Sequence, residues 1–335
     1  MTGPNIFHYA TSELSQDAFI CWLLAWSDPT YDGMPMHEIG MDFLKELYSR
    51  SARVFPDKIA TIEVRKQDKN IDVQCIVNGK SVILIEDKTQ TVQHSEQLPR
   101  YKKTLLDTGF SEEQIIPFYI QTGDQSDFSN AYKHGYTVFL RKDFLLFFKK
   151  HESIRLLINN QILENFASHL SMIEDRVQSF RCLPLAEWGW DSWKGFFTEL
   201  QGALGTGAWS YVANPAGGFL GFFWGWYGDE NCEQYLQLEQ GKLCFKIWVK
   251  DRESRAELRD KYYCVLIAAG EKYGQRIIRP ARMGMGEYMT VAILANEYRI
   301  CNDNGTIDIP KTVSYLQELT EILEHALEED VKIKI

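Results

Sequence analysis

The sequence predicts an α/β (α+β) protein in which a central mixed sheet is flanked by helices and is followed by a second, C-terminal α+β domain. Apolar residues recur at helical spacing in some segments and alternate at strand spacing in others. These helical and strand-like segments are interleaved along the 335 residues. The chain is 45% hydrophobic and 13% aromatic, which is enough apolar material for one large core or two ordinary ones.

The first half begins with an amphipathic helix that starts at Ser12, an N-cap residue, and ends before Asp28-Pro29. The segments at helical spacing are residues 12–27, 41–48, 94–107 and 151–178. The strand-like segments are residues 60–64, 71–77, 81–86, 115–121 and 136–140. Asn78-Gly79 joins the second strand to the third and is a strong hairpin signal.

The sequence changes character near Arg181, so we predict two domains, residues 1–180 and residues 181–335. The second begins with the aromatic residues Trp188, Trp190, Trp193, Phe196 and Phe197. Strand-like stretches follow at 218–227, 234–249 and 288–294, with a turn inside the second of them, and helices are expected at 252–273 and 310–327. We expect the tryptophans to pack in a core rather than to stack on bases.

Charge and composition limit the function classes. The net charge of −10 and the pI of about 5.3 argue against tight, nonspecific binding of nucleic acid. There is no run of about 18 apolar residues and no basic and apolar leader at Met1, so we expect a cytoplasmic protein without a membrane partner. The seven cysteines include no C-x-x-C motif, and we expect them to be reduced and buried.

Charged residues that could act in catalysis or bind a metal lie at the end of the predicted strand 81–86 and directly after it. Side chains alternate along a strand, so Glu86 and Lys88 point to one face and Asp87 to the other. A carboxylate and an ammonium group at the end of a buried strand cost free energy unless they are paired or bind a metal.

The hairpin register decides whether Asp72 joins this pair. A two-residue Asn78-Gly79 loop places Val77 opposite Lys80, and then Asp72 and Glu86 lie on opposite faces. A three-residue loop, or a bulge, places Asp72 opposite Glu86. In that register two carboxylates and one lysine converge, and their hard oxygen ligands suit Mg²⁺ or Mn²⁺.

The following helix supplies a second signal. Gln97 and Tyr101 are four residues apart and share a helix face with His94. The segment Gln97-Leu98-Pro99-Arg100-Tyr101 has the form Q-hydrophobic-x-x-Y.

Together these motifs resemble the PD-(D/E)XK nuclease superfamily, which has the restriction-endonuclease-like fold. Asp72 matches the first motif aspartate, Glu86-Asp87-Lys88 matches (D/E)-X-K, and Gln97 to Tyr101 resembles the extra motif of RecB-type members. The chain is similar to an uncharacterised bacterial group of this superfamily, and the fold covers roughly residues 10 to 145. The proline expected before the motif aspartate is replaced by Ile71.

The resemblance implies Mg²⁺-dependent hydrolysis of phosphodiester bonds in nucleic acid, with DNA the expected substrate and defence or DNA processing the expected role. Asp72 and Glu86 would bind one or two metal ions, with Glu13 of the first helix and the backbone carbonyl of Asp87 as further ligands. Lys88 would orient the nucleophile, and Gln97 and Tyr101 would support the site or contact the phosphate backbone.

Alternatives remain open at this point. The same fold could serve as a catalytically silent module that binds nucleic acid or protein, or as an enzyme for a small phosphorylated substrate. His94 and the loop residues Arg276, Arg279 and Arg282 are candidate phosphate contacts. The C-terminal domain would choose the substrate, sense a ligand or form a homodimer, and its acidic last helix is either a solvated face or the dimer surface.

Overall fold

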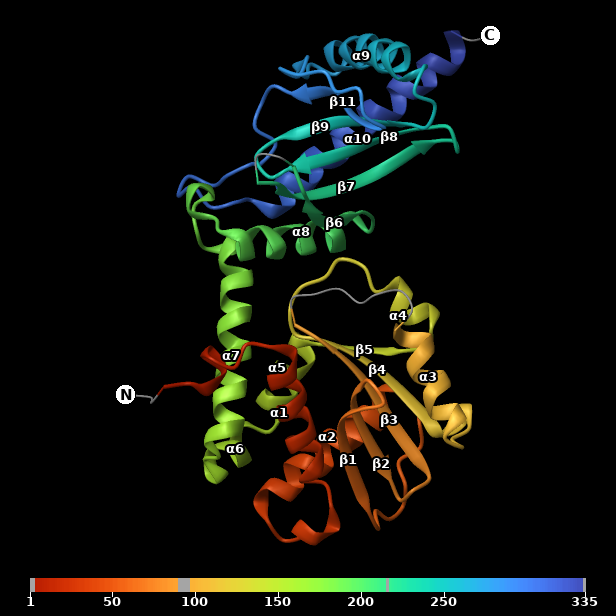
Figure 1. The fold of residues 1–335 in the computed structure, drawn as a ribbon. Coiled ribbons are helices and arrows are strands. Elements are labelled where there is room, and N and C mark those ends of the chain that lie inside the picture. The colour runs from red at the N-terminus through yellow and green to blue at the C-terminus, as the bar shows by residue number, and fades with distance from the viewer. Residues whose placement is uncertain (1–3, 90–96, 215–216, 334–335) are drawn as a thin grey trace. The chain divides into compact units, whose positions relative to one another are not determined.

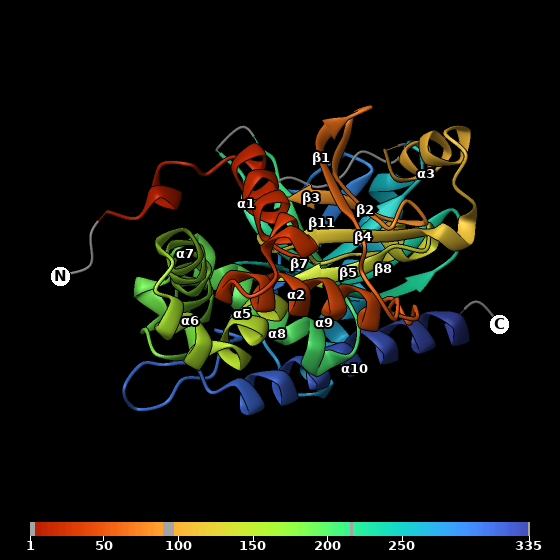
Figure 2. The same ribbon diagram turned by 90° about the horizontal axis from the view of Figure 1, so that it is seen from below.

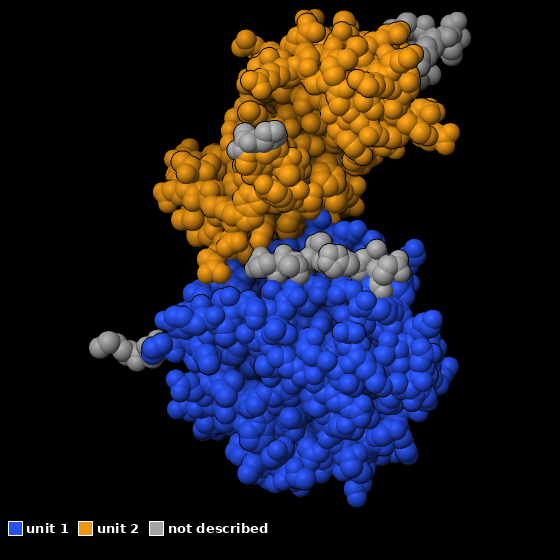
Figure 3. Space-filling model, in the orientation of Figure 1, with its two compact units in different colours: residues 1–175 blue, residues 176–335 orange. Residues whose placement is uncertain are grey.

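The computed structural model describes residues 4–89, 97–214 and 217–333, without the side chains beyond residue 327 (Figure 1). The chain divides into two compact units, residues 1–175 and 176–335, which Figure 3 colours separately. The division falls near the predicted boundary at 180. In the described ranges, no helix has the length and apolar character needed to cross a membrane.

Unit 1 is built on a mixed five-stranded sheet in the order β1-β2-β3-β4-β5 (Figure 1). The strands are β1 (Ile62–Asp68), β2 (Ile71–Val77), β3 (Ser81–Lys88), β4 (Ile115–Gln121) and β5 (Thr137–Leu140). The first three form an antiparallel meander, and β3, β4 and β5 run parallel to one another. The predicted mixed sheet flanked by helices is therefore confirmed.

Helices cover both faces of this sheet. They are α1 (Glu13–Ala25), α2 (Pro35–Arg50), α3 (Gln97–Asp107), α4 (Ser129–Lys133), α5 (Arg141–Lys150), α6 (Glu152–Ile158) and α7 (Gln161–Gln178). One core joins α1, α2, α5 and α7 to the face that carries Ile83 and Ile85. A smaller core joins α3 and α4 to the face that carries Val82 and Leu84. Figure 2 shows α2 and α3 on opposite sides of β4. The alternation of β3 therefore sends successive side chains into two different cores.

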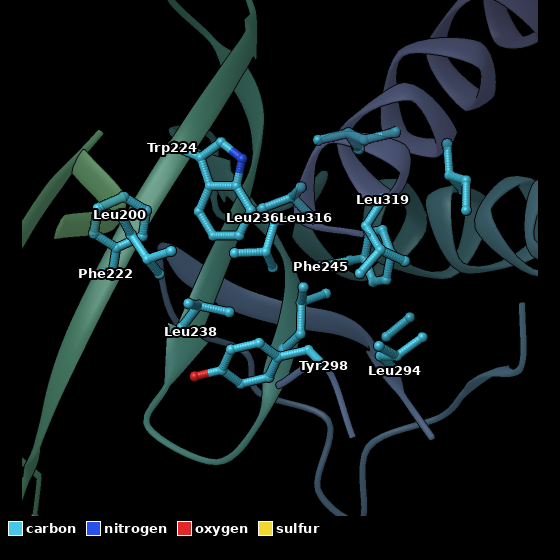
Figure 4. Packing of buried hydrophobic residues seen from close by; sticks show 14 of the residues in the cluster. Leu200, Phe222, Trp224, Leu236, Leu238, Phe245, Leu294, Tyr298, Leu316 and Leu319 are labelled. Atoms are coloured by element: carbon cyan, nitrogen blue, oxygen red, sulfur yellow. The ribbon is translucent and has the colours of Figure 1, made fainter. Parts of the chain in front are cut away.

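Unit 2 contains a six-stranded antiparallel sheet in the order β10-β11-β9-β8-β7-β6. Its strands are β6 (Ala208–Val212), β7 (Phe219–Gly228), β8 (Cys232–Glu239), β9 (Leu243–Val249), β10 (Ile277–Ile278) and β11 (Tyr288–Leu294). Its helices are α8 (Trp190–Leu204), α9 (Arg255–Lys272) and α10 (Ile309–Ile333). Figure 4 shows side chains of the sheet and of α8 and α10 interdigitating in its core. Short 3-10 turns lie at Ile6–His8, Pro29–Tyr31, Glu112–Gln114, Ser179–Arg181 and Leu185–Glu187.

The tryptophans of unit 2 are mainly core residues. Trp188, Trp193, Trp209 and Trp224 are buried, and the indole of Trp224 donates a hydrogen bond to Thr320 Oγ1 at 2.9 Å. The prediction fails for Trp190 and Trp226, each 43% exposed.

The seven cysteines are free thiols, as expected, but only some of them are buried. Cys75 and Cys244 are buried, whereas Cys182, Cys264 and Cys301 are exposed because they lie in a connecting segment, on the outer side of α9 and in a loop.

Candidate functional site

The β2–β3 hairpin has the register that brings Asp72 opposite Glu86. Val77 pairs with Ser81 and Val73 with Ile85, so three residues, Asn78 to Lys80, form the loop. Asn78 and Gly79 both have positive φ, at 54° and 64°, which is the backbone that an Asn-Gly loop favours. Of the two registers that the sequence allows, the structure therefore has the one that places both carboxylates on one face.

Both carboxylate oxygens of Asp72 are held by the protein. The backbone N–H of Asp87 donates to Oδ2 at 3.0 Å, so the two strands are tied together beyond their last paired residues. The side-chain amide of Gln67, on β1, donates to Oδ1 at 3.0 Å. Asp72 is half-buried, and its orientation is fixed from two neighbouring strands.

Glu86 is a fully buried carboxyl group at the end of β3. Lys88 Nζ lies 2.6 Å from its Oε1, but neither Glu86 oxygen accepts a well-directed hydrogen bond from a described residue. Burial, and then the charge of Asp72, raise the pKa of Glu86 to about 7 against the opposing effect of Lys88. The single positive charge of Lys88 therefore does not offset the combined effect of burial and the Asp72 charge on the pKa of Glu86.

Lys88 is buried and linked to two acidic residues. Its Nζ donates to the backbone carbonyl of Asp87 at 3.2 Å and lies 3.7 Å from Glu13 Oε2. Burial works against its positive charge, but Glu86, with Glu13 and Asp72, raises the pKa of Lys88 overall. Glu13, in the first turn of α1, also accepts a 3.4 Å hydrogen bond from the Thr89 N–H. Lys88 is therefore an ammonium ion between the strand carboxylates and α1.

Asp87 points to the opposite face of β3, as the alternation predicts. Gln16 Nε2 donates to its Oδ1 at 2.5 Å, and the Thr122 hydroxyl donates to Gln16 Oε1. Burial, and then the charge of Asp17, raise the pKa of Asp87 well above its ordinary range. The Asp87 side chain therefore ties β3 to α1, while its carbonyl faces Lys88.

Tyr101 of α3 is 2% exposed and packs in the smaller core of unit 1. Burial, followed by the charges of Glu86 and Asp72, raises the pKa of Tyr101 to about 12, so its hydroxyl is neutral and belongs to the electrostatic surroundings of the site. Gln97 is the half-buried first residue of α3. His94 lies outside the described residues.

Few carboxylates are available at this site to bind a divalent cation. In the parts of the chain with described side chains, no three His, Cys, Asp or Glu residues form a group that could hold a metal. Asp72 and Glu86 form a pair, and the Glu13 carboxylate lies 3.7 Å from Lys88 Nζ. Mg²⁺ is commonly bound by one or two carboxylates with several waters, so the two oxygen donors fit Mg²⁺ and do not suit an all-protein cage.

Sequence reasoning missed two residues of the site, Gln16 and Gln67. Each donates a side-chain hydrogen bond to a motif aspartate, Gln16 from α1 and Gln67 from β1. Little in the sequence indicates either residue, because a glutamine carries no charge. The partner of Gln16 is 71 residues away, and the partner of Gln67 lies on the neighbouring strand.

Two further features involve none of these residues. Arg276, Arg279 and Arg282 are exposed residues of unit 2, and Arg279 lies 5.5 Å above the ring of Tyr263. An open groove of about 540 Å³ in unit 1 is lined by α2, α6 and the loop before α2, and contains no predicted site residue.

Asp17 occupies the second turn of α1 and is 1% exposed. Its Oδ2 accepts a 3.0 Å hydrogen bond from the same Gln67 amide that binds Asp72. Burial, and then the charge of Asp72, raise the pKa of Asp17 to about 6. Asp17 is therefore a buried support of the site rather than an exposed ligand.

The chain was compared with protein-family models, curated proteins and solved structures, and none of them matches it significantly.

Proposed function

We propose that unit 1 is a metal-dependent nuclease of the PD-(D/E)XK type, with a restriction-endonuclease-like core and nucleic acid, DNA first, as its substrate. The observation that carries the proposal is the convergence of Asp72, Glu86 and Lys88 at the ends of two antiparallel strands. Glu86 is fully buried and its oxygens lack well-directed donors, a condition that a divalent cation beside Asp72 would relieve.

Each residue has a distinct role in this proposal. Asp72 and Glu86, with the carbonyl of Asp87, would hold Mg²⁺ or Mn²⁺. When bound, the metal supplies Lewis acidity and lowers the pKa of a coordinated water. The Lys88 ammonium would orient the attacking water and stabilise negative charge on the phosphoryl oxygens as it develops.

Three further residues would act through these groups. Glu13 would keep the ammonium of Lys88 in position, since its carboxylate lies 3.7 Å from Nζ. Tyr101 would support the site with a buried, neutral hydroxyl, whose pKa is raised by burial and by the charges of Glu86 and Asp72. Gln97, the half-buried first residue of the same helix, is less buried than Tyr101 and is the better placed of the two α3 residues to meet a phosphate.

The proposal predicts metal-dependent cleavage that requires both Glu86 and Lys88. Circular DNA, linear DNA and RNA would be incubated with Mg²⁺ or Mn²⁺ and with the wild type, Glu86→Gln or Lys88→Met. We expect each variant to lose at least about 100-fold in rate, the usual effect of removing one preorganised charge-stabilising group. Cutting of the circular form would identify an endonuclease.

Lys80→Met is the matched control, because Lys80 is an exposed lysine in the loop of the same hairpin. It should cleave like the wild type, and thermal unfolding would verify that all variants are folded. Cleavage that survives in both site variants would contradict the assignment of the site. A wild type that cleaves none of the substrates with either metal would favour a catalytically silent binding module on the same fold.

A further inference from the structure

Gln67 connects two acidic residues from different elements. Its Nε2 lies 3.0 Å from Asp72 Oδ1 and 3.0 Å from Asp17 Oδ2, so one amide group donates to both. We infer that Gln67 is a positioning residue that holds Asp72 in the orientation needed to bind the catalytic metal. The inference rests on the proposed function and adds a residue that lies outside its motifs.

The backbone of Gln67 favours this interpretation. Gln67 has a φ of 53°, a left-handed conformation that costs free energy for a residue with a side chain. It lies on β1 just before the turn that leads into β2, and β1 pairs with β2 on both sides of it. Such strain persists where surrounding interactions over-determine it, and the two hydrogen bonds to Asp72 and Asp17 are interactions of this kind.

Asp17, the second acceptor of the Gln67 amide, has a position fixed by packing. Asp17 belongs to α1 and is 1% exposed, so its position is set by the packing of that helix against the sheet. Through Gln67, the rigid body of α1 determines where the Asp72 carboxylate points. Without this amide, the carboxylate would keep the Asp87 N–H as its one donor among the described residues and could rotate about its Cβ–Cγ bond.

The contact leaves Asp72 able to bind a metal. An ionised carboxylate has about four lone-pair sites, and Gln67 and the Asp87 N–H occupy two of them. The other two remain for a cation on the side of Glu86. Hydrogen bonds that orient a ligand from behind in this way typically change metal affinity or activity by about 10- to 100-fold.

The experiment measures the binding of Mn²⁺ alone, by titration calorimetry and by the electron paramagnetic resonance signal of free Mn²⁺. It compares the full-length wild type with Gln67→Met, which keeps the length of the side chain and removes the donor. Gln74→Met is the matched control, because buried Gln74 lies on β2, the strand paired with β1, and donates to the backbone carbonyl of Asp68 at 2.9 Å, not to a carboxylate of the site.

We expect Gln67→Met to weaken Mn²⁺ binding by about tenfold while it remains folded, and Gln74→Met to lower the melting temperature without changing Mn²⁺ affinity. At saturating Mn²⁺, the cleavage rate of Gln67→Met should return towards that of the wild type, since the lost function is occupancy of the site.

Unchanged Mn²⁺ affinity in Gln67→Met would overturn the inference and leave the proposed function intact. Equal weakening in both variants would also overturn it, because the effect would then belong to the hairpin as a whole. A wild type that binds no Mn²⁺ would instead contradict the proposed metal site, and with it the inference.

Discussion

Three consecutive residues at the end of β3 have two different environments. Glu86 and Lys88 share the face of Asp72, whereas Asp87 contacts Gln16 of α1. This division could be predicted from the sequence, because the alternation of side chains along a strand is a local geometric rule. The register that brings Asp72 to Glu86 could only be reduced to two alternatives, since two- and three-residue loops are both compatible with Asn78-Gly79.

The supporting glutamines could not be predicted in the same way. Gln16 reaches Asp87 across 71 residues of sequence, and this contact exists only once α1 packs on the sheet. Gln67 contacts Asp72 because its own backbone has a positive φ, and the neighbouring residue types do not predict that backbone conformation. Tertiary packing therefore placed the Gln16 amide at the site, whereas the left-handed backbone of Gln67, five residues before Asp72, placed the other.

The buried carboxyl of Asp17 should make the stability of the metal-free protein depend on pH. Its pKa is raised to about 6 in the folded chain from an ordinary value near 3.8. The protonated form is thus favoured by folding, and its contribution is complete below about pH 3.8 and is lost as pH rises through about 6. With chelator present, we expect the free energy of unfolding at pH 7.5 to be lower than at pH 5.

Denaturant unfolding of the wild type and of Asp17→Asn would measure this effect. The introduced amide can still accept a hydrogen bond from Gln67, so the variant should be more stable than the wild type at pH 7.5 and vary less between pH 5 and pH 7.5. Asp57→Asn, at an exposed residue, should leave the pH dependence unchanged. An Asp17→Asn protein with the pH dependence of the wild type would contradict the prediction.

Among the elements, the strands of unit 1 were predicted best, because turn residues bound their apolar runs. Predicted strands at 71–77 and 115–121 coincide with β2 and β4. The helix α5 was missed because it follows β5 without an intervening turn, between Leu140 and Arg141. The helix α8 was missed because its aromatic residues also favour strands, although Trp193, Phe197 and Leu200 have helical spacing.

Helix boundaries were predicted less accurately where a single residue starts or interrupts the helix. The single helix expected at 151–178 is divided into α6 and α7, because Asn159 adopts a left-handed conformation with φ of 49°. The helix expected at 41–48 begins earlier, at Pro35, a residue that suits the first turn of a helix. Both differences reflect single residues whose backbone preference outweighs the apolar pattern.

Two glycines should respond in opposite directions to the same substitution. Gly79 has a φ of 64° in the β2–β3 loop, and Gly202 lies near the end of α8; a Cβ added to either meets no atom within 4 Å. We expect Gly79→Ala to destabilise the protein by about 1 kcal/mol, since alanine disfavours positive φ. We expect Gly202→Ala to stabilise it by about 0.5 kcal/mol, because alanine is the better helix former.

Thermal and denaturant unfolding of the two variants would test this pair. Because neither change creates a steric contact, any difference in sign comes from backbone conformation alone. Equal effects of the two substitutions would contradict the assigned turn and helix.

For the molecule as a whole, each cluster of buried hydrophobic side chains found among the described residues lies within one unit. The cluster of unit 2 includes Phe222 and Phe245 (Figure 4). The two clusters of unit 1 flank its sheet. Phe222→Ala should therefore lower the stability of unit 2 by about 3 to 5 kcal/mol, as deletion of a buried aromatic ring does.

Calorimetry would resolve this effect, with Mn²⁺ added to mark the transition of unit 1. We expect the transition that Mn²⁺ stabilises to be unchanged in Phe222→Ala, and the other to move to lower temperature. A single transition that shifts as one in both experiments would show that the two units unfold cooperatively.

The separation of contacts along the chain has a consequence for how the site assembles. The contact between Asp72 and the Asp87 N–H closes 15 residues of chain, whereas the contacts of Gln16 with Asp87 and with Thr122 close 71 and 106. Loop-closure entropy grows with length, and non-local pairings form slowly. The pairing of the two motif carboxylates therefore belongs to the kinetically local part of the fold, whereas the contacts that tie the Asp87 side chain to α1 depend on much longer closures.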